Sequence, residues 1–258
     1  MIIDTHCHLD DERYREDISE VIERAKANGV ERFIIPGADP KTLQRAIELS
    51  EAYDEVYFAV GVHPYDAHNY NKSFLEEFVT HPKCVAIGEC GLDYFRLPAS
   101  QEEIEAQKKL QKEVFVDQIL WAKELKLPLI VHVRESSADS LELLEQYAGE
   151  EGGVLHCYNA DESLLKLAKR NFYYGIGGVL TFKNARKLVN VYPKIPKERL
   201  IIETDAPYLT PHPHRGERNE PSYCKLVASK MSQLSEENES ELEQLTTNNA
   251  LRLFLKVK

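Results

Sequence analysis

Two histidines near the start of the chain stand two residues apart. His6 and His8 follow the apolar residues Ile2 and Ile3, as at a strand that ends in polar groups. Side chains alternate faces along a β-strand, which rises about 3.3 Å per residue. The two imidazoles therefore point the same way, with Cα atoms about 6–7 Å apart, and can converge on one cation. The pair is equally consistent with a surface histidine beside a core histidine, so the other strand ends must decide.

Further side chains of the metal-ligating type follow other short apolar runs. They are His63, Glu89, His132, His156 and Asp205, each at the end of a different predicted strand. Five of the nine histidines stand at strand ends, and the other four lie in predicted loops or near helix ends. Random placement would rarely produce this concentration. We therefore interpret these residues, with His6 and His8, as one site.

The elements that position these side chains alternate between strand and helix. Runs of β-branched and aromatic residues predict strands at the start of the chain and at 32–35, 56–60, 84–87, 129–131, 154–155, 172–176 and 200–202. Apolar residues at helical spacing predict helices over 12–28, 40–53, 72–80, 100–125, 137–147, 161–170, 183–191, 222–234 and 239–254. Asn159 and Glu162 stand at capping-box spacing for the helix over 161–170.

This alternation predicts the fold. The strands read as continuous apolar runs, which is typical of parallel strands buried on both faces. In 258 residues, the pattern predicts a TIM (β/α)8 barrel, an α/β fold, as a single domain over residues 1–258. A doubly wound open sheet is the alternative, but such sheets usually carry a glycine-rich loop after the first strand, and none is present here. In a barrel all strands open on one face at their C-terminal ends, so the ligand-type residues form a ring there.

The bulk composition limits the class of protein. No apolar run approaches the roughly 18 residues of a membrane span, and no signal peptide is recognisable, so we expect a cytoplasmic protein without membrane contact. Five cysteines without CxxC spacing favour reduced, buried thiols over disulfides or a cysteine zinc site. The net charge of −11 argues against broad binding to nucleic acid. It does not exclude an enzyme that processes nucleic acid at a local site rich in cations.

Four histidines and two carboxylates exceed what one catalytic cation needs. A single catalytic zinc takes three protein ligands and a water. Six ligands therefore indicate two cations that share a carboxylate, and Glu89 is the natural bridge because its strand lies between those of the others. Two cations about 3.5–4 Å apart clamp the attacking and leaving oxygens of a displacement and acidify a water. Asp205 could ligate one cation and orient or deprotonate that water.

At these motifs the sequence resembles a known family. Six segments carry the resemblance: Asp-Thr-His-Cys-His-Leu at 4–9, Gly-Val-His-Pro at 61–64, Gly-Glu-Cys-Gly-Leu-Asp-Tyr at 88–94, His-Val-Arg at 132–134, Leu-His-Cys-Tyr at 155–158 and Glu-Thr-Asp-Ala-Pro-Tyr-Leu at 203–209. Together they look like the motifs of the TatD family of metal-dependent deoxyribonucleases. The resemblance implies a barrel of the amidohydrolase superfamily. It also implies hydrolysis of phosphodiester bonds in DNA, chiefly by 3′→5′ exonuclease action on ends or single strands.

The resemblance also implies a role for each residue. One cation would be held by His6, His8, Glu89 and Asp205, and the second by Glu89, His132 and His156. His63 would lie beside the cations and face substrate, so that Asp205, Glu89 and His63 are the expected catalytic residues. Arg134, Tyr94, Arg215 and Asn219 are candidates for substrate contact, with anchoring of loops as the equally plausible alternative. No obligate protein partner is expected.

Two alternatives to a nuclease remain open. A two-metal hydrolase of a small phosphoester, lactone or amide is favoured by the acidic balance of the chain. Other two-metal amidohydrolases bridge their cations with a carboxylated lysine near the end of the fourth strand, however. Here that end carries Glu89, and Lys83 is on the wrong side of the strand, which favours the nuclease. A binding protein with a structural metal is the third hypothesis, and the complete set of ligands argues against it.

The identity of the cations is open at the level of sequence. Histidine-rich ligation favours zinc, manganese, cobalt or iron over magnesium, which prefers oxygen ligands and keeps its waters. The resemblance, by contrast, implies that magnesium also serves. The expectation is two divalent cations, Zn, Mn or Mg.

Overall fold

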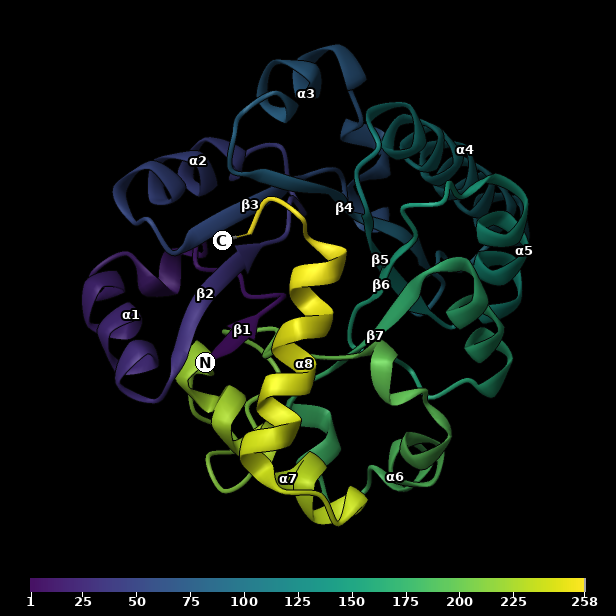
Figure 1. Cartoon of the computed structure of the whole chain (residues 1–258). Coiled ribbons are helices and arrows are strands. Elements are labelled where there is room, and N and C mark those ends of the chain that lie inside the picture. The colour runs from purple at the N-terminus through teal and green to yellow at the C-terminus, as the bar shows by residue number, and fades with distance from the viewer. Residues whose placement is uncertain (258) are drawn as a thin grey trace.

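Eight parallel strands form one sheet whose order in space follows the order of the sequence. The computed structural model describes residues 1–257. The strands are β1 (Ile2–Asp4), β2 (Val30–Ile35), β3 (Val56–Val60), β4 (Cys84–Asp93), β5 (Leu129–Arg134), β6 (Gly153–Leu155), β7 (Phe172–Ile176) and β8 (Leu200–Ile202). Each pairs in parallel with the next along the chain, so the sheet curls into the predicted barrel (Figure 1).

Helices surround the strands on the outside of the barrel (Figure 1). They are α1 (Ile18–Ala27), α2 (Leu43–Ala52), α3 (Lys72–Val79), α4 (Gln101–Leu125), α5 (Ser137–Tyr147), α6 (Arg186–Val191), α7 (Cys224–Ser235) and α8 (Glu239–Leu253). Short 3₁₀ helices lie at Glu12–Tyr14, Pro64–Asn69, Glu162–Arg170, Gly178–Thr181, Tyr192–Lys194, Lys197–Arg199 and Pro221–Tyr223. No helix in residues 1–257 has the length and apolar character that crossing a membrane requires.

The barrel closes between its first and last strands, at their C-terminal ends. The Thr5 N–H donates to the Ile202 carbonyl at 3.2 Å, and the Asp205 N–H donates to the His6 carbonyl at 2.9 Å. A parallel bridge between Cys7 and Ala206 continues the contact. The seam therefore lies at the face on which the ligand-type residues gather.

The other end of the barrel is covered by α8. Figure 1 shows this helix, in yellow, lying across the centre of the ring of strands. Its residues Ala250 and Leu253, with the following Phe254, join the interior core formed by inward side chains such as Ile34 and Ile130. The buried Asn249 amide donates to the carbonyl of Leu200 at 2.8 Å, at the start of β8. With this end filled, the open end is the one that carries the site.

The predicted elements are confirmed with local differences. β4 is longer than predicted, running to Asp93 rather than to residue 87. The segment 161–170 is a 3₁₀ helix, and Asp161 caps it by accepting from the Ser163 N–H at 3.0 Å. The expected capping box from Asn159 is therefore wrong, since its side-chain oxygen accepts from the Asp161 N–H. The helices expected over 12–28 and 183–191 begin later, at residues 18 and 186.

The seam supplies a first test of stability. The fully buried Asp4 carboxylate accepts from the Thr204 N–H at 3.0 Å and from the Thr204 hydroxyl at 2.6 Å. Burial raises the pKa of Asp4 to about 7, so the group accepts with both oxygens only at a pH above this value. There we expect Asp4→Asn to lower the free energy of unfolding by about 1–3 kcal/mol, because the amide nitrogen that replaces one oxygen cannot accept a hydrogen bond. Urea unfolding followed by circular dichroism measures the change. The exposed Asp54→Asn is the control, and an equal effect there would contradict the assignment.

Candidate metal centre

A bulge in β4 places the central carboxylate. Ile87 pairs with Leu129 and Cys90 with Val131, so β4 holds one residue more than β5 between these pairs. Bulges of this kind turn a side chain away from its regular face. Gly88 makes the bulge possible, because it adopts a φ of +147° and a Cβ there would lie 2.5 Å from the Ile130 carbonyl oxygen. Glu89 follows, buried at the top of the barrel with 3 % of its surface exposed.

One oxygen of Glu89 faces the ligands from the first and last strands. Glu89 Oε2 lies 3.4 Å from His6 Nε2 and 4.0 Å from His8 Nε2. Asp205 Oδ1 completes this group, at 3.3 Å from His8 Nε2 and 3.7 Å from His6 Nε2. The donor atoms of His6, His8 and Asp205 all lie within 4.8 Å of one another, as the ligands of one ion must.

The other oxygen of Glu89 faces the ligands from the middle of the chain. Glu89 Oε1 lies 3.0 Å from His132 Nδ1 and 3.1 Å from His156 Nε2. These two ring nitrogens are 3.3 Å apart. A second group of ligand size, Glu89, His132 and His156, thus adjoins the first. One carboxylate divides its two oxygens between two groups of nitrogen and oxygen donors, which is the arrangement of a bridging ligand.

Some polar atoms of the cluster lack a hydrogen-bond partner within the protein and are placed to bind a metal instead. His6 is fully buried, and neither of its ring nitrogens has a hydrogen-bond partner among the described residues. Buried polar groups without a partner are rare because each costs the free energy of its lost hydration. A cation at Nε2 would satisfy that nitrogen of His6. The mixture of imidazole and carboxylate donors suits a divalent transition metal or zinc.

The charges in the cluster support one another. Burial raises the pKa of Glu89, but the imidazoles of His156, His6 and His63 outweigh it and hold that pKa well below its usual value. Burial likewise opposes ionisation of Asp205, yet the hydrogen bond and charge of His8 keep the pKa of Asp205 lowered. Both carboxylates are therefore negative at neutral pH, the form in which carboxylates bind cations.

Two further carboxylates orient the histidines from behind. Asp93 Oδ2 lies 2.9 Å from His132 Nε2, and Glu203 Oε1 lies 3.5 Å from His156 Nδ1. Metal-bound histidines almost always place their second nitrogen against such a partner, which fixes the tautomer and the ring. Sequence reasoning missed both as site residues, although Asp93 lies in the same motif as Glu89 and Glu203 stands two residues before Asp205. That adjacency was the available signal.

Two buried glutamines on α4 hold the backbone around the site. The Gln118 side chain accepts from the Val62 N–H at 2.8 Å and donates to the Val62 carbonyl at 3.2 Å. Gln111 makes the same pair of bonds with Asp93, at 2.9 and 3.0 Å. The two glutamines lie seven residues apart, two turns on one helix face. They fix the strand ends next to His63 and Asp93.

His63 lies beside the cluster in an orientation that suits hydrogen-bond donation. Its Nδ1 accepts from the Tyr65 N–H at 3.1 Å, and its Nε2 lies 3.7 Å from Glu89 Oε1. Burial lowers the pKa of His63 to about 4, so the ring is neutral at pH 7. A neutral ring that accepts at Nδ1 carries its proton on Nε2. That proton points into the site.

The four expected substrate contacts lie in different surroundings. Arg134 is exposed at the end of β5, with its guanidinium 3.7 Å from the centre of the Phe95 ring, and it lines both the cavity that holds the cluster and the one beside it. Arg215 stacks on Phe182 and donates to the Thr210 carbonyl at 2.8 Å. The structure brings Arg134 to the cluster and leaves Arg215 outside the cavities that adjoin it.

The other two candidates anchor loops. The Tyr94 hydroxyl donates to Asp139 Oδ2 at 2.8 Å. The Asn219 side chain is fully buried, donates to the Thr204 carbonyl at 2.9 Å and accepts from the Glu220 N–H. The burial of Asn219 corrects the expectation of substrate contact, because no substrate atom reaches it. It holds the segment that carries Asp205.

Lys83 lies where the sequence placed it, at the far end of β4. Its ammonium donates to the carbonyls of Ser50, Tyr53 and Asp54, at 2.6, 2.8 and 3.1 Å. Those three bonds occupy all its protons. A carboxylated lysine bridge from Lys83 is therefore incompatible with this structure.

The carboxylate behind His132 gives a second prediction. We expect Asp93→Asn to lower affinity for the cation of the group that contains His132 about 10–100-fold, since outer partners of metal-bound histidines contribute that much. Activity should return as the metal concentration is raised. Metal titration of the apoprotein by calorimetry, beside activity at each concentration, measures both. A loss of activity that excess metal does not reverse would contradict a positioning role.

Comparison with known proteins agrees with this geometry. The family model described as TatD related DNase matches residues 3–255. The "Uncharacterized metal-dependent hydrolase YabD" of Bacillus subtilis (strain 168) is 46 % identical over 259 residues, which cover 98 % of this chain and 99 % of that protein. The "3'-5' ssDNA/RNA exonuclease TatD" of Edwardsiella piscicida is 33 % identical over 267 residues, covering 98 % and 99 %. Among solved structures, the TatD homologue YJJV of Escherichia coli K12 superposes with a TM-score of 0.89 at 29 % identity, over 98 % of each chain.

Proposed function

Since this chain belongs to the family of TatD-related DNases, we propose that it is a metal-dependent hydrolase of phosphodiester bonds in DNA, acting as a 3′→5′ exonuclease on single strands. A similar protein from Edwardsiella piscicida carries the name of a 3′-5′ ssDNA/RNA exonuclease. Others carry only the name of a metal-dependent hydrolase. The division of Glu89 between two groups of ligands is the observation that carries the proposal.

The residues that would hold the cations follow from the distances. His6, His8, Asp205 and Glu89 Oε2 would hold one cation. His132, His156 and Glu89 Oε1 would hold the other. When bound, two such cations supply positive charge to the phosphate oxygens and lower the pKa of a water. Zn, Mn and Mg are the cations to compare, and the histidine content favours the first two.

The side chains of the chain itself position the reaction. Hydrolysis joins the oxygen of a water to phosphorus and breaks one P–O ester bond, while the leaving oxygen takes up a proton. Asp205, ionised and 15 % exposed, faces the opening and can accept the proton of the attacking water. His63 can donate its Nε2 proton to a phosphate oxygen. Arg134, on the rim, supplies a charge for the strand.

Digestion of a labelled strand tests the proposal. Protein freed of metal with a chelator should leave a 5′-labelled single-stranded oligonucleotide intact. Addition of Zn²⁺, Mn²⁺ or Mg²⁺ should produce a ladder that shortens from the 3′ end. Metal analysis of the active protein should give two cations per chain. If the protein cleaves no DNA with any of the three cations but hydrolyses a small phosphoester, lactone or amide, the result would instead favour a two-metal hydrolase of small molecules.

Three expectations stay predictions. They are the organisation of residues 1–258 as a single domain, a cytoplasmic location, and action without an obligate protein partner. The chain's own geometry supports the first, because the strands that close the barrel and the helix that fills it come from opposite ends of the sequence.

A further inference from the structure

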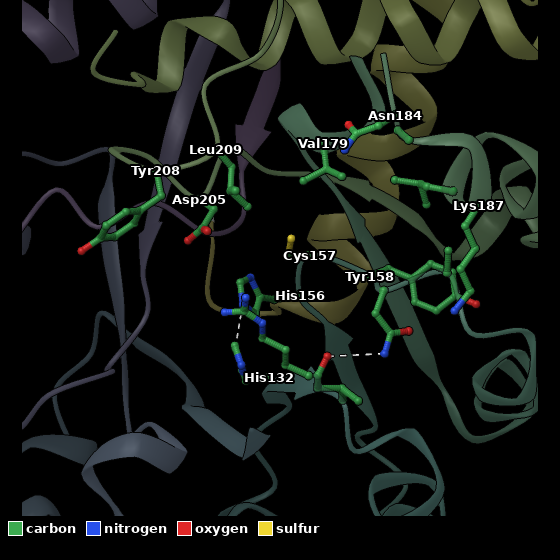
Figure 2. A pocket seen from close by; sticks show the side chains of 16 residues that line it. His132, His156, Cys157, Tyr158, Val179, Asn184, Lys187, Asp205, Tyr208 and Leu209 are labelled. Atoms are coloured by element: carbon green, nitrogen blue, oxygen red, sulfur yellow. Dashed lines mark hydrogen bonds between the residues drawn. The ribbon is translucent and has the colours of Figure 1, made fainter. Parts of the chain in front are cut away.

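A cavity of about 540 Å³ opens beside the cluster, on the side of β5 to β8. Its walls come from the loops that follow these four strands. Figure 2 shows His132, His156 and Asp205 toward one side of it, and Asn184 and Lys187 toward the other. The volume lies within the range of about 300–1,000 Å³ that is typical of pockets for small ligands. It suits one nucleoside and is far too small for a duplex.

The position of the cavity ties it to the scissile bond. A second cavity, of about 360 Å³, holds the cluster itself, because His8, His63 and Glu89 are among its walls. The two cavities adjoin, since five residues line both: His132, Arg134, His156, Asp205 and Tyr208. A phosphodiester held at the cluster therefore has the first cavity directly beside it, open to one of its two nucleosides.

The lining of the first cavity suits a flat, apolar ring. Tyr158, Val179, Leu188 and Leu209 supply aromatic and aliphatic surface. The Tyr158 ring is held rigidly, because its hydroxyl donates to the Asp161 carbonyl at 2.8 Å and its edge packs on Tyr174. Stacking of a base on an aromatic side chain is a common and sequence-tolerant source of affinity for single strands.

Two polar side chains, Asn184 and Lys187, line the far side of the cavity. Among the described residues neither makes a side-chain hydrogen bond or close ion pair, and Lys187 is near enough to Asp161 for its charge to act on that carboxylate. An amide can pair with the donors and acceptors on the edge of any base, and an ammonium can bind the ring nitrogens or carbonyl oxygens that a base presents. The second cavity offers instead Tyr65, Arg96 and Asp93, a more polar setting that suits the rest of a phosphate backbone.

We propose that the cavity walled by the loops after β5 to β8 binds the terminal nucleoside of a DNA strand, with its base against Tyr158, Val179 and Leu188. This inference rests on the proposed function and adds the site that recognises the strand end. Because the cavity has room for a single nucleoside, the strand would lose one terminal nucleotide at a time. Ala185, which lines the cavity at the start of α6, is the position at which the space can be filled.

The test compares two 5′-labelled single strands that differ only in the 3′-terminal residue. One ends in a normal nucleoside and the other in an abasic deoxyribose. We expect the wild-type protein, with its best cation, to release the normal residue with a kcat/KM ~10-fold higher, as loss of one stacking contact predicts. In Ala185→Phe the preference should vanish, because the normal substrate slows to the rate of the abasic one.

Controls separate this inference from folding and from the proposed function. Ala27→Phe makes the same change at an exposed residue of α1, at the opposite end of the barrel, and should keep the preference. Val179→Phe fills the same cavity from another loop and guards against misfolding of the first variant, which thermal unfolding also monitors. Three results would overturn the inference while leaving DNA hydrolysis in place. The wild-type protein could cleave both strands at equal rates, the filled variants could slow both strands equally, or the protein could cut internally without releasing the terminal residue. Cleavage of neither strand would overturn the proposed function itself.

Discussion

Replacing Glu89 by glutamine should abolish turnover, with kcat on single-stranded DNA reduced about 10³-fold or more. Glutamine keeps the volume and the position on the bulge, but it removes the charge that both groups of ligands share. One charged or dipolar group aimed at the reacting atoms typically contributes about 10²–10³-fold, and here two cations depend on the same carboxylate. Metal analysis should show the bound cations falling from two to one or none.

Thermal unfolding and a matched substitution at an exposed glutamate provide the controls for this variant. Glutamine keeps the volume of the side chain, so Glu89→Gln should fold, although metal-free protein should unfold at a somewhat lower temperature than the wild type because the variant loses the charge that pairs with His132 and His156. Glu142→Gln, at an exposed position on α5, should leave activity unchanged. Retention of two cations and of near-normal turnover in Glu89→Gln would show that Glu89 is not the bridge.

Asp205→Asn should lower kcat by about 10²–10⁴-fold, the range contributed by a general base, with the fold intact. The substitution keeps the volume of the side chain and loses the charge that pairs with His8. Rates on DNA are to be measured over a range of metal concentrations. A role as base predicts a loss that no amount of metal restores, whereas a role as ligand alone predicts recovery when the cation is in excess.

Near-full activity of Asp205→Asn would contradict both roles. A separate pH profile distinguishes them further. In the wild type the hydrogen bond and charge of His8 outweigh burial and lower the pKa of Asp205, so protonation of this group should not reduce activity until the solution is more acidic than the ordinary pKa of an aspartate. A decline that begins near pH 6 would point to loss of the histidine ligands instead.

The barrel was predictable from sequence because each strand is a continuous apolar run and the helices have apolar residues at helical spacing. Residues 56–60, 172–176 and 200–202 were placed to the residue. The gathering of His6, His132, His156 and Asp205 followed from one rule, that parallel strands end on the same face. The three histidines lie 3.0 to 3.4 Å from the carboxylate oxygens of Glu89 in the structure, which agrees with that reasoning.

What sequence reasoning missed depends on details of backbone and packing. The bulge at Gly88 extends β4 to Asp93, and a period-two reading cannot place a carboxylate beyond such a shift in register. Asp93 and Glu203 were therefore not expected behind His132 and His156. Asn219 carries a polar side chain in a proline-containing loop, which suggests exposure, yet three hydrogen bonds bury it. Burial of that kind arises from tertiary contacts, which no local pattern records.

The seam between β1 and β8 has a consequence for the assembly of the site. His6 and His8 stand on one side of the seam and Asp205 on the other, and the Asp205 N–H donates to the His6 carbonyl across it. A fragment of this chain that ends before β8 cannot assemble the first group of ligands. The centre is therefore completed only when the barrel closes, and a truncated chain without β8 lacks half of it.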